Sequence, residues 1–207
     1  RNISLNQKYS MLFKSDETFR HRVLSLVVDP RRQVSLNFSY LPGLHDVNGL
    51  DNVFSLDLSN CRNIEDVSCL GGVHTVILRN CQKVQNVSSL GNVHTLDLQG
   101  CQLVHDVSAL GNVSNLTLRG CRGLEDVRCL SNVERLSLTF CSLLSQVDCL
   151  KNIRYLNLSC CASITNVSSL GGVYELDLSK CPGIKDVSAL GNVHKLNLSV
   201  CNNLQDV

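Results

Sequence analysis

The sequence carries almost no excess of charge of either sign. Its 207 residues include 19 Lys and Arg against 18 Asp and Glu, which leaves a formal net charge of +1. Proteins that bind nucleic acid or an anionic membrane surface usually carry a positive excess, because the summed field recruits the polyanion. We therefore expect neither a nucleic-acid partner nor a membrane partner.

Long hydrophobic runs and targeting segments are also missing. No apolar stretch reaches the roughly 18–20 residues of a membrane-spanning helix, and no charged and then apolar leader precedes a small-residue cleavage site. We expect a soluble chain. Because the sequence begins at Arg1 without Met and ends at Val207 inside a repeat, we also expect a fragment or processed form of a longer protein.

The motifs of common catalytic and cofactor sites do not occur. The sequence has no glycine-rich phosphate loop, no H-E-x-x-H or G-x-S-x-G motif and no C-x-x-C pair. We therefore predict that the protein is not an enzyme. We expect no catalytic residues, no cofactor, no metal site and no small-molecule substrate.

What the sequence does have is a 20-residue unit that recurs without insertion. From Asp51 the first two units read DNVFSLDLSNCRNIEDVSCL and GGVHTVILRNCQKVQNVSSL, and the series runs to a truncated GNVHKLNLSVCNNLQDV. Residues 31–50 fit the same pattern, although Leu41 replaces the cysteine of the later units. Such self-similarity is typical of a solenoid, in which each unit buries its apolar side against its neighbours. We predict that residues 31–207 form nine rungs, the last incomplete.

Each unit has apolar residues at positions 3, 6, 8, 11, 14, 17 and 20, counted from Asp51. Positions 6 and 8 have the period of two that marks a short strand. One strand per coil, stacked at about 4.8 Å, predicts a parallel sheet of roughly 40 Å over nine rungs. Only nine residues follow position 11 in each unit, too few for an ordinary helix. We therefore expect tight turns or short 3₁₀ segments on the convex side and a gently curved arc.

Two polar positions of the unit also have structural interpretations. Position 16 is usually Asp or Asn, as at Asp66 and Asn86, and such a side chain can cap the backbone N–H groups of the return turn. Position 2 alternates between Asn and Gly, as at Asn92 and Gly72. These residue types suit a left-handed turn, which we expect at position 2.

The twelve cysteines follow the repeat and not a disulfide pattern. Eight occur once per 20 residues at position 11: Cys61, Cys81, Cys101, Cys121, Cys141, Cys161, Cys181 and Cys201. A residue used in this way fills one structural position, and free cysteine is among the most buried residue types. We predict reduced interior thiols and, from them, an intracellular, cytoplasmic location.

The other cysteines do not have the spacing of metal ligands. Cys69, Cys129 and Cys149 each follow a position-11 cysteine by eight residues, which is not zinc-ligand spacing. Cys160 and Cys161 form a vicinal pair, which we interpret as one outward and one inward position of the repeat.

Histidines recur at position 4, near the start of the predicted strands. His74 and His94 fall on neighbouring rungs, so we expect their rings about 5 Å apart. Two imidazoles without a fixed carboxylate make a weak metal site, and we interpret these residues as surface histidines.

The repeat resembles the cysteine-containing class of leucine-rich repeats. The pattern L-x-x-L-x-L-x-x-C-x-x-I-x-D is carried in the unit from Asp51 by Val53, Leu56, Leu58, Cys61, Ile64 and Asp66. The resemblance covers about 177 of the 207 residues. It implies a horseshoe or arc in which the cysteine thiol hydrogen-bonds to backbone between rungs. The units here are shorter than is usual for that class, which carries a helix in each repeat.

A narrower resemblance concerns the amino-acid sequence of the unit. The pattern L-G-N-V-H-x-L-x-L-x-x-C-x-x-x-x-D-V-S-A-L is similar to that of F-box and leucine-rich-repeat proteins encoded in large families by giant DNA viruses. This resemblance implies a protein of the host cytoplasm or of a viral particle. It also implies substrate recognition for a ubiquitin-ligase adaptor if an F-box lies upstream.

Residues 1–30 show no repeat and are predicted to form a helical N-terminal cap. Asp16 or Ser15 can cap a helix with Phe19, Val23, Leu24 and Val27 on its apolar face, ending before Pro30, and a shorter helix is expected from Asn6 to Phe13. Such a cap would seal the open edge of the first rung. The alternative, that these residues are the tail of an F-box-like module, stays open.

The leading hypothesis for function is a module that binds another protein on the outward face of its strands. Between Ser131 and Lys180 this face concentrates large aromatic and charged residues, of types that are enriched in binding hot spots. The predicted partner-binding residues are Glu134, Arg135, Phe140, Arg154, Tyr155, Tyr174 and Glu175. In the rungs near Asp57, Asp97 and Ser199 the face holds short polar residues, which we interpret as serving solubility. The alternative function is a structural component of a viral particle or another assembly.

Overall fold

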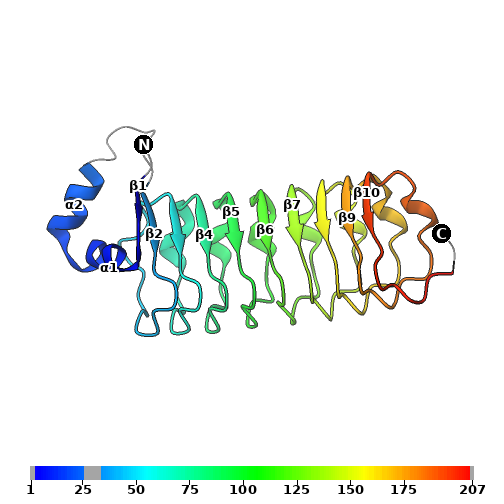
Figure 1. Cartoon of the computed structure of the whole chain (residues 1–207), viewed down its shortest axis with the longest axis horizontal. Coiled ribbons are helices and arrows are strands. Elements are labelled where there is room, and N and C mark those ends of the chain that lie inside the picture. Colours follow the sequence, from blue (N-terminus) through cyan, green and yellow to red (C-terminus); the bar gives the residue numbers. More distant parts are fainter. Residues whose placement is uncertain (1–2, 26–33, 206–207) are drawn as a thin grey trace.

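The computed structural model describes residues 3–25 and 34–205, and it contains one sheet of ten parallel strands in sequence order. The strands lie in a row along the long axis of the molecule (Figure 1). They are β1 (Ile3–Leu5), β2 (Val34–Asn37), β3 (Ser55–Asp57), β4 (Thr75–Ile77), β5 (Thr95–Asp97), β6 (Asn115–Thr117), β7 (Arg135–Ser137), β8 (Tyr155–Asn157), β9 (Glu175–Asp177) and β10 (Lys195–Asn197). The predicted solenoid with one short parallel strand per coil is confirmed.

The apolar positions of the repeat form a single continuous core. Positions 6 and 8 point inward from each strand, and the same residue types stack from rung to rung. Leu116 on β6 pairs in register with Leu96 on β5 and with Leu136 on β7, and only 2% of its surface is exposed. Because every coil is filled by its own side chains, the core has the form of a column and not of a ligand cavity.

The chain returns between strands through short 3₁₀ segments, as predicted. These are η1 (Ser68–Gly72), η2 (Ser88–Asn92), η3 (Ser108–Asn112), η4 (Arg128–Leu130), η5 (Asp148–Leu150), η6 (Ser168–Gly172) and η7 (Ser188–Leu190). The position-16 side chain caps each of them except η5: its Oδ1 accepts the backbone N–H two residues later, at 2.8–3.0 Å. This bond favours the carboxylate, so the pKa values of Asp66 and Asp106 lie below the ordinary value.

The prediction of a left-handed turn at position 2 is wrong. Apart from Gly49, the left-handed residues of the described part of the chain lie instead at position 10, just after the repeat strands: Tyr40, Asn60, Asn80, Gly100, Gly120, Phe140, Cys160, Lys180 and Val200, with φ between 57° and 74°. The backbone N–H of position 10 donates to the position-9 carbonyl of the next rung, as from Lys180 to Ser199 at 2.8 Å. Where a following rung is present, this bond stabilises the left-handed conformation whatever residue the position carries.

The N-terminal residues extend the sheet as well as cap it. Strand β1 pairs in parallel with β2, with Ile3 opposite Val34 and Leu5 opposite Leu36. The sequence analysis predicted only helices here, because a strand of three residues gives no recognisable periodicity. Since β1 hydrogen-bonds to the edge of β2, the first repeat strand has a neighbour on both sides.

Two helices follow β1, as predicted: α1 (Gln7–Ser15) and α2 (Glu17–Ser25). Asn6 accepts the Tyr9 N–H at the start of α1, and Asp16 accepts the Phe19 N–H at the start of α2. Phe13 and Val23 are buried against the core of the solenoid, so the helices cover its first end. Val27, Pro30 and the side chain of Leu24 lie outside the described part of the structure.

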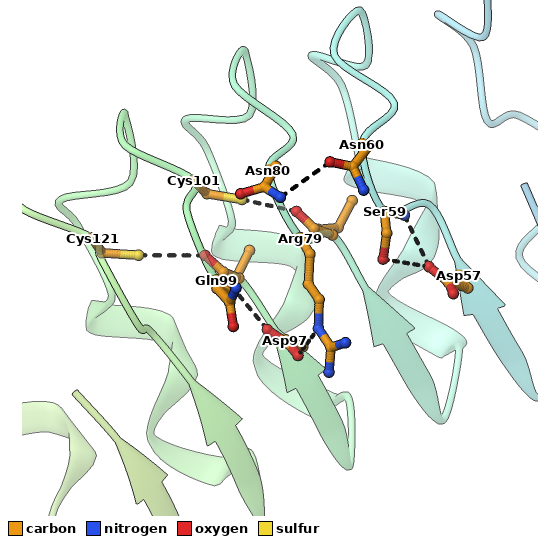
Figure 2. A network of polar contacts seen from close by, with 11 residues as sticks. Asp57, Ser59, Asn60, Arg79, Asn80, Asp97, Gln99, Cys101 and Cys121 are labelled. Carbon is orange, nitrogen blue, oxygen red and sulfur yellow. Dashed lines mark hydrogen bonds and ion pairs between the residues drawn. The ribbon is translucent and has the colours of Figure 1, made fainter. Parts of the chain in front are cut away.

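The position-11 cysteines form a ladder of thiol hydrogen bonds through the core. Each Sγ donates to the position-8 carbonyl of the preceding rung at 3.0–3.5 Å, as the resemblance to cysteine-containing repeats implied. Figure 2 shows two of these bonds, from Cys101 and Cys121. Burial raises the pKa of both thiols to about 12. All twelve cysteines are free thiols.

A second set of thiols has a similar role on the return side. Cys69, Cys129 and Cys149 at position 19 donate to the position-17 carbonyl of the preceding rung, at 3.4, 3.2 and 3.7 Å. Ser89 makes the same bond with its hydroxyl group, to Val67 O at 3.3 Å. These cysteines therefore satisfy backbone carbonyls between rungs.

The replacement Leu116→Ala is expected to destabilise the fold by about 2–5 kcal/mol, because it opens a cavity between two stacked rungs. Chemical denaturation followed by circular dichroism measures the change. The control Leu143→Ala removes a side chain that is 51% exposed, and it should cost less than about 0.5 kcal/mol. A cost below about 0.5 kcal/mol for Leu116→Ala itself would contradict the register.

The thiols of Cys81, Cys101, Cys121 and Cys141 are expected to resist labelling by N-ethylmaleimide at pH 8 in the native state, because they are buried and protonated. They should react as fast as free cysteine once the chain is unfolded in guanidinium chloride. Mass spectrometry of digested samples identifies the labelled residues. The half-exposed Cys160 is the control, and replacing it with Ser should remove one rapidly labelled site. Rapid native labelling of the four ladder thiols would overturn the assignment.

Candidate binding face

The outward side chains at positions 4, 5, 7 and 9 of the repeat form one broad surface, the strand face. It is hollowed over β4 to β9, where side chains of these strands line an open depression of about 470 Å³. Its floor is the sheet itself, with Thr95, Asn115 and Thr117 near the middle, and Arg79, Arg135 and Glu175 also line it. The depression is open along its length, which suits an extended segment of a partner better than a small molecule.

Position 7 fixes the turn that ends each strand. In six rungs the Asp or Asn at this position accepts the backbone N–H of position 9 through Oδ1, at 2.9–3.1 Å. Figure 2 shows this bond from Ser59 to Asp57 and from Gln99 to Asp97. The sequence analysis interpreted the short polar residues near Asp57, Asp97 and Ser199 as serving solubility, and these three residues also have a structural role. They belong to a turn that leads into the left-handed position 10.

One strong ion pair crosses two rungs of the strand face. Arg79 Nε donates to Asp97 Oδ2 at 2.6 Å, and the Asp97 side chain is mostly buried (Figure 2). This hydrogen bond raises the pKa of Arg79. Beside it, Asn80 Nδ2 donates to Asn60 Oδ1 at 3.1 Å, so the turns of neighbouring rungs are also linked. The Asp97 carboxylate and the Arg79 guanidinium are therefore paired with each other within the fold.

Four of the seven predicted partner-binding residues come together as an arginine–tyrosine cluster: Arg135, Arg154, Tyr155 and Tyr174. The Arg135 guanidinium lies over the Tyr155 ring, 3.6 Å from its centroid. Arg154 lies 5.3 Å from the Tyr155 centroid and 5.7 Å from that of Tyr174. The two tyrosine rings meet edge to face at 6.0 Å. Cation–π contact of this kind holds each guanidinium at a defined place on the surface.

The other three predicted residues are placed differently. Glu175 borders the cluster and pairs with Lys195 at 3.2 Å. Glu134 is exposed at the start of β7. Phe140 lies at the opposite end of the strand, in the left-handed turn, where the Arg119 guanidinium sits 5.3 Å from its ring centroid. Of the seven residues, Arg135, Tyr155 and Glu175 line the depression, and Phe140 lies apart from the cluster, so the seven do not form one compact patch.

The sequence analysis noted the histidines of the strand face but did not single out Phe54 or join these rings to Tyr174. His194 stacks on Tyr174 at 4.6 Å and extends the cluster to the last rung. At the other end, Phe54 stacks on His74 at 4.3 Å, and His74 lies 4.6 Å from His94, close to the predicted spacing. All of these occupy position 4 of their units. The sequence analysis interpreted the histidines of this position as surface residues, and adding Phe54 and Tyr174 at the same position would have found the aromatic stripe.

The pKa of His74 is lowered from its ordinary value. Burial and the neighbouring His94 both lower its pKa, because each disfavours the charged imidazolium. The pair has no third ligand: within residues 3–25 and 34–205, no group of three or more His, Cys, Asp or Glu side chains could hold a metal ion. In the same part of the chain, no helix has the length and apolar character of a membrane span.

Neither a protein-family model nor a curated protein sequence matches the chain. Among solved structures, it is similar to internalin C2 from Listeria monocytogenes, with a TM-score of 0.57 and 22% identity over 79% of this chain and 80% of that chain. An internalin F structure from the same organism gives a TM-score of 0.46 and 13% identity, over 84% of this chain and 71% of that one. A domain of InlJ, described as including a cysteine ladder, gives 0.39 and 14%, over 79% and 53%.

These structures are bacterial, so the narrower resemblance to viral F-box proteins stays a prediction. The likeness to internalin C2 extends over most of both chains, and the sheet of this chain has one parallel strand in every 20-residue coil. On this basis, the fold of the chain is that of a leucine-rich-repeat solenoid.

Proposed function

We propose that the chain is a non-enzymatic protein-interaction module that binds a partner protein on its strand face. The arginine–tyrosine cluster is the observation that carries this proposal. Tyr and Arg are enriched in binding hot spots, because they combine a large contact area with polar groups. Here they border an open depression on a rigid sheet, so a partner would meet side chains that are already ordered.

The simplest competing explanation is that the aromatic residues only stabilise the sheet by pairing across strands. The tyrosine and histidine rings do stack between rungs, which is what that explanation requires. However, Tyr174 is still 40% exposed and Phe140 is 44% exposed. Large aromatic surface left open to water on a sheet face favours a binding role in addition to the structural one.

A more specific function depends on whether other domains or subunits are joined to this chain. If an F-box lies upstream, the strand face would recognise substrates for a ubiquitin-ligase adaptor. If the protein belongs to a viral particle or another assembly, the chain would be one of its structural components. Co-purification with a ligase scaffold or with assembled particles separates these two roles. In either case we propose a reducing, intracellular location for so many free thiols.

A photocrosslinking side chain at position 174 tests where a partner binds. Benzoylphenylalanine in place of Tyr174 should crosslink to a protein partner, whereas the same residue in place of Leu143 should not. Leu143 is also well exposed but lies in the turn after Cys141, outside the strand face. Crosslinks from Leu143 alone would place the contact elsewhere and refute the proposal.

Once the partner protein is identified, Arg154→Ala and Tyr155→Ala should each weaken its binding by about 1–3 kcal/mol. The melting temperature should change little, because Arg154 is exposed and both side chains lie outside the core. Isothermal titration calorimetry and thermal denaturation provide the two measurements, with Arg122→Ala as a control in a turn outside the strand face. Unchanged affinity in both variants would exclude the cluster as the contact surface.

A further inference from the structure

We infer that the arginine–tyrosine cluster and Arg119 bind carboxylate side chains of an acidic protein segment lying across the depression. This inference rests on the proposed function and specifies the chemistry of the partner. It starts from two observations: Arg119, Arg135 and Arg154 each lie over an aromatic ring, and none of the three pairs with an acidic side chain of the described residues.

Several basic side chains of the chain have an acidic partner of their own. The pairs are Lys14–Asp46 at 3.1 Å, Arg79–Asp97 at 2.6 Å, Arg128–Asp126 at 2.6 Å and Lys195–Glu175 at 3.2 Å. Within the described residues, Arg119, Arg135 and Arg154 form no ion pair with Asp or Glu. These three arginines instead lie over aromatic rings.

Stacking on a ring leaves the chemically important part of a guanidinium available. The N–H donors of arginine lie in the plane of the group, in a fork that matches the two oxygens of a carboxylate. The face of the Arg135 guanidinium is directed to Tyr155, so the ring fixes the group without using the donors at its edge. A carboxylate that binds there meets a donor set whose side-chain entropy has already been lost in the stack.

The positions of the three arginines define how a segment would lie. Arg135, at the beginning of β7, lines the depression, and Arg154 lies next to Tyr155, which also lines it. Arg119 follows the end of β6 two residues after Thr117, which lines the depression, and it lies over Phe140. The floor between them is lined by the short polar side chains Asn115, Thr117 and Ser137. A segment that crosses this floor could present acidic side chains to Arg119 and to the cluster.

Acidic side chains on the same face argue against a continuous polyanion. Glu134 adjoins Arg135 in sequence, and Glu175 and Asp177 line the far end of the depression. A nucleic acid would bring a phosphate past each of these carboxylates, and the net charge of +1 offers little general attraction. Separate carboxylates in a protein segment can contact the arginines and avoid the acidic positions.

The test is selection of random peptides displayed on phage, with the whole chain as the immobilised target. We expect Asp and Glu to be enriched in the selected peptides relative to the unselected library. A selected peptide, synthesised and labelled, is then titrated by fluorescence polarisation. Its affinity should fall at least about tenfold in the double variant Arg135→Gln and Arg154→Gln, and should stay unchanged in the control Arg122→Gln. Binding to the wild type should also weaken as salt increases.

A lysine variant tests whether binding requires the planar guanidinium group or only its positive charge. The double variant Arg135→Lys and Arg154→Lys keeps both charges but removes the planar fork. Its affinity for the peptide should therefore lie between the affinities of the wild type and of the glutamine variant. If the lysine variant bound the peptide as tightly as the wild type does, the role given to the stacked guanidinium groups would be overturned. Far-UV circular dichroism of each variant checks that the exposed substitutions leave the fold intact.

The remaining outcomes separate this inference from the function on which it rests. Selected peptides that depend on Tyr155 but carry no acidic enrichment would refute the inference and leave the strand face as a binding surface. Peptides whose binding is unaffected by any strand-face substitution would refute both. Tighter binding of a phosphoserine peptide or a single-stranded oligonucleotide than of the acidic peptide would show that the arginines recognise phosphate, which also overturns the inference.

Discussion

The structure depends on one constraint: each coil is hydrogen-bonded to the next, so every coil must follow the same backbone path. Parallel strands pair residue by residue between units that are 20 positions apart, as Leu96 pairs with Leu116. Beyond the strand, position 10 continues the bonding with an N–H donated to the next rung. A coil with a different path would break bonds to both neighbours, and this explains why the repeat tolerates no insertion.

The same constraint decides how the polar groups of the unit are used. The backbone leaves carbonyls unpaired where a coil turns, and small side chains at fixed positions donate to them. Position-11 thiols serve the position-8 carbonyls, and position-19 thiols or hydroxyls serve the position-17 carbonyls. No buried side-chain nitrogen or oxygen of the described residues lacks a partner. With the interior and the turns committed to structure, variation that serves binding is left to the outward positions of the strands.

Much of this arrangement could be predicted because each repeat is an independent observation of the same unit. Inward positions, the thiol position and the position-16 cap recur in residue type, so their roles follow from periodicity. Position 10 could not be predicted, since it carries Asn, Gly, Phe, Cys, Lys and Val, and its conformation is imposed by the neighbouring rung. For the cluster, the sequence predicted which residue types gather on the strand face but not which of them contact one another. Whether Phe140 lies beside Arg135 depends on the three-dimensional structure. Strand β1 gave no signal, as its partner lies about 30 residues away.

Lys180 offers the most direct measurement of the central claim. Its φ of 58° is unfavourable for a residue with a Cβ atom, and the account holds that the bond from its N–H to Ser199 O of the next rung stabilises it there. Lys180→Ala and Lys180→Gly remove the same side chain and differ only in Cβ. The account predicts that the glycine variant has the higher free energy of unfolding, by about 1–2 kcal/mol. If the alanine variant is equally or more stable, the backbone at position 10 is not imposed by stacking, and the central claim fails.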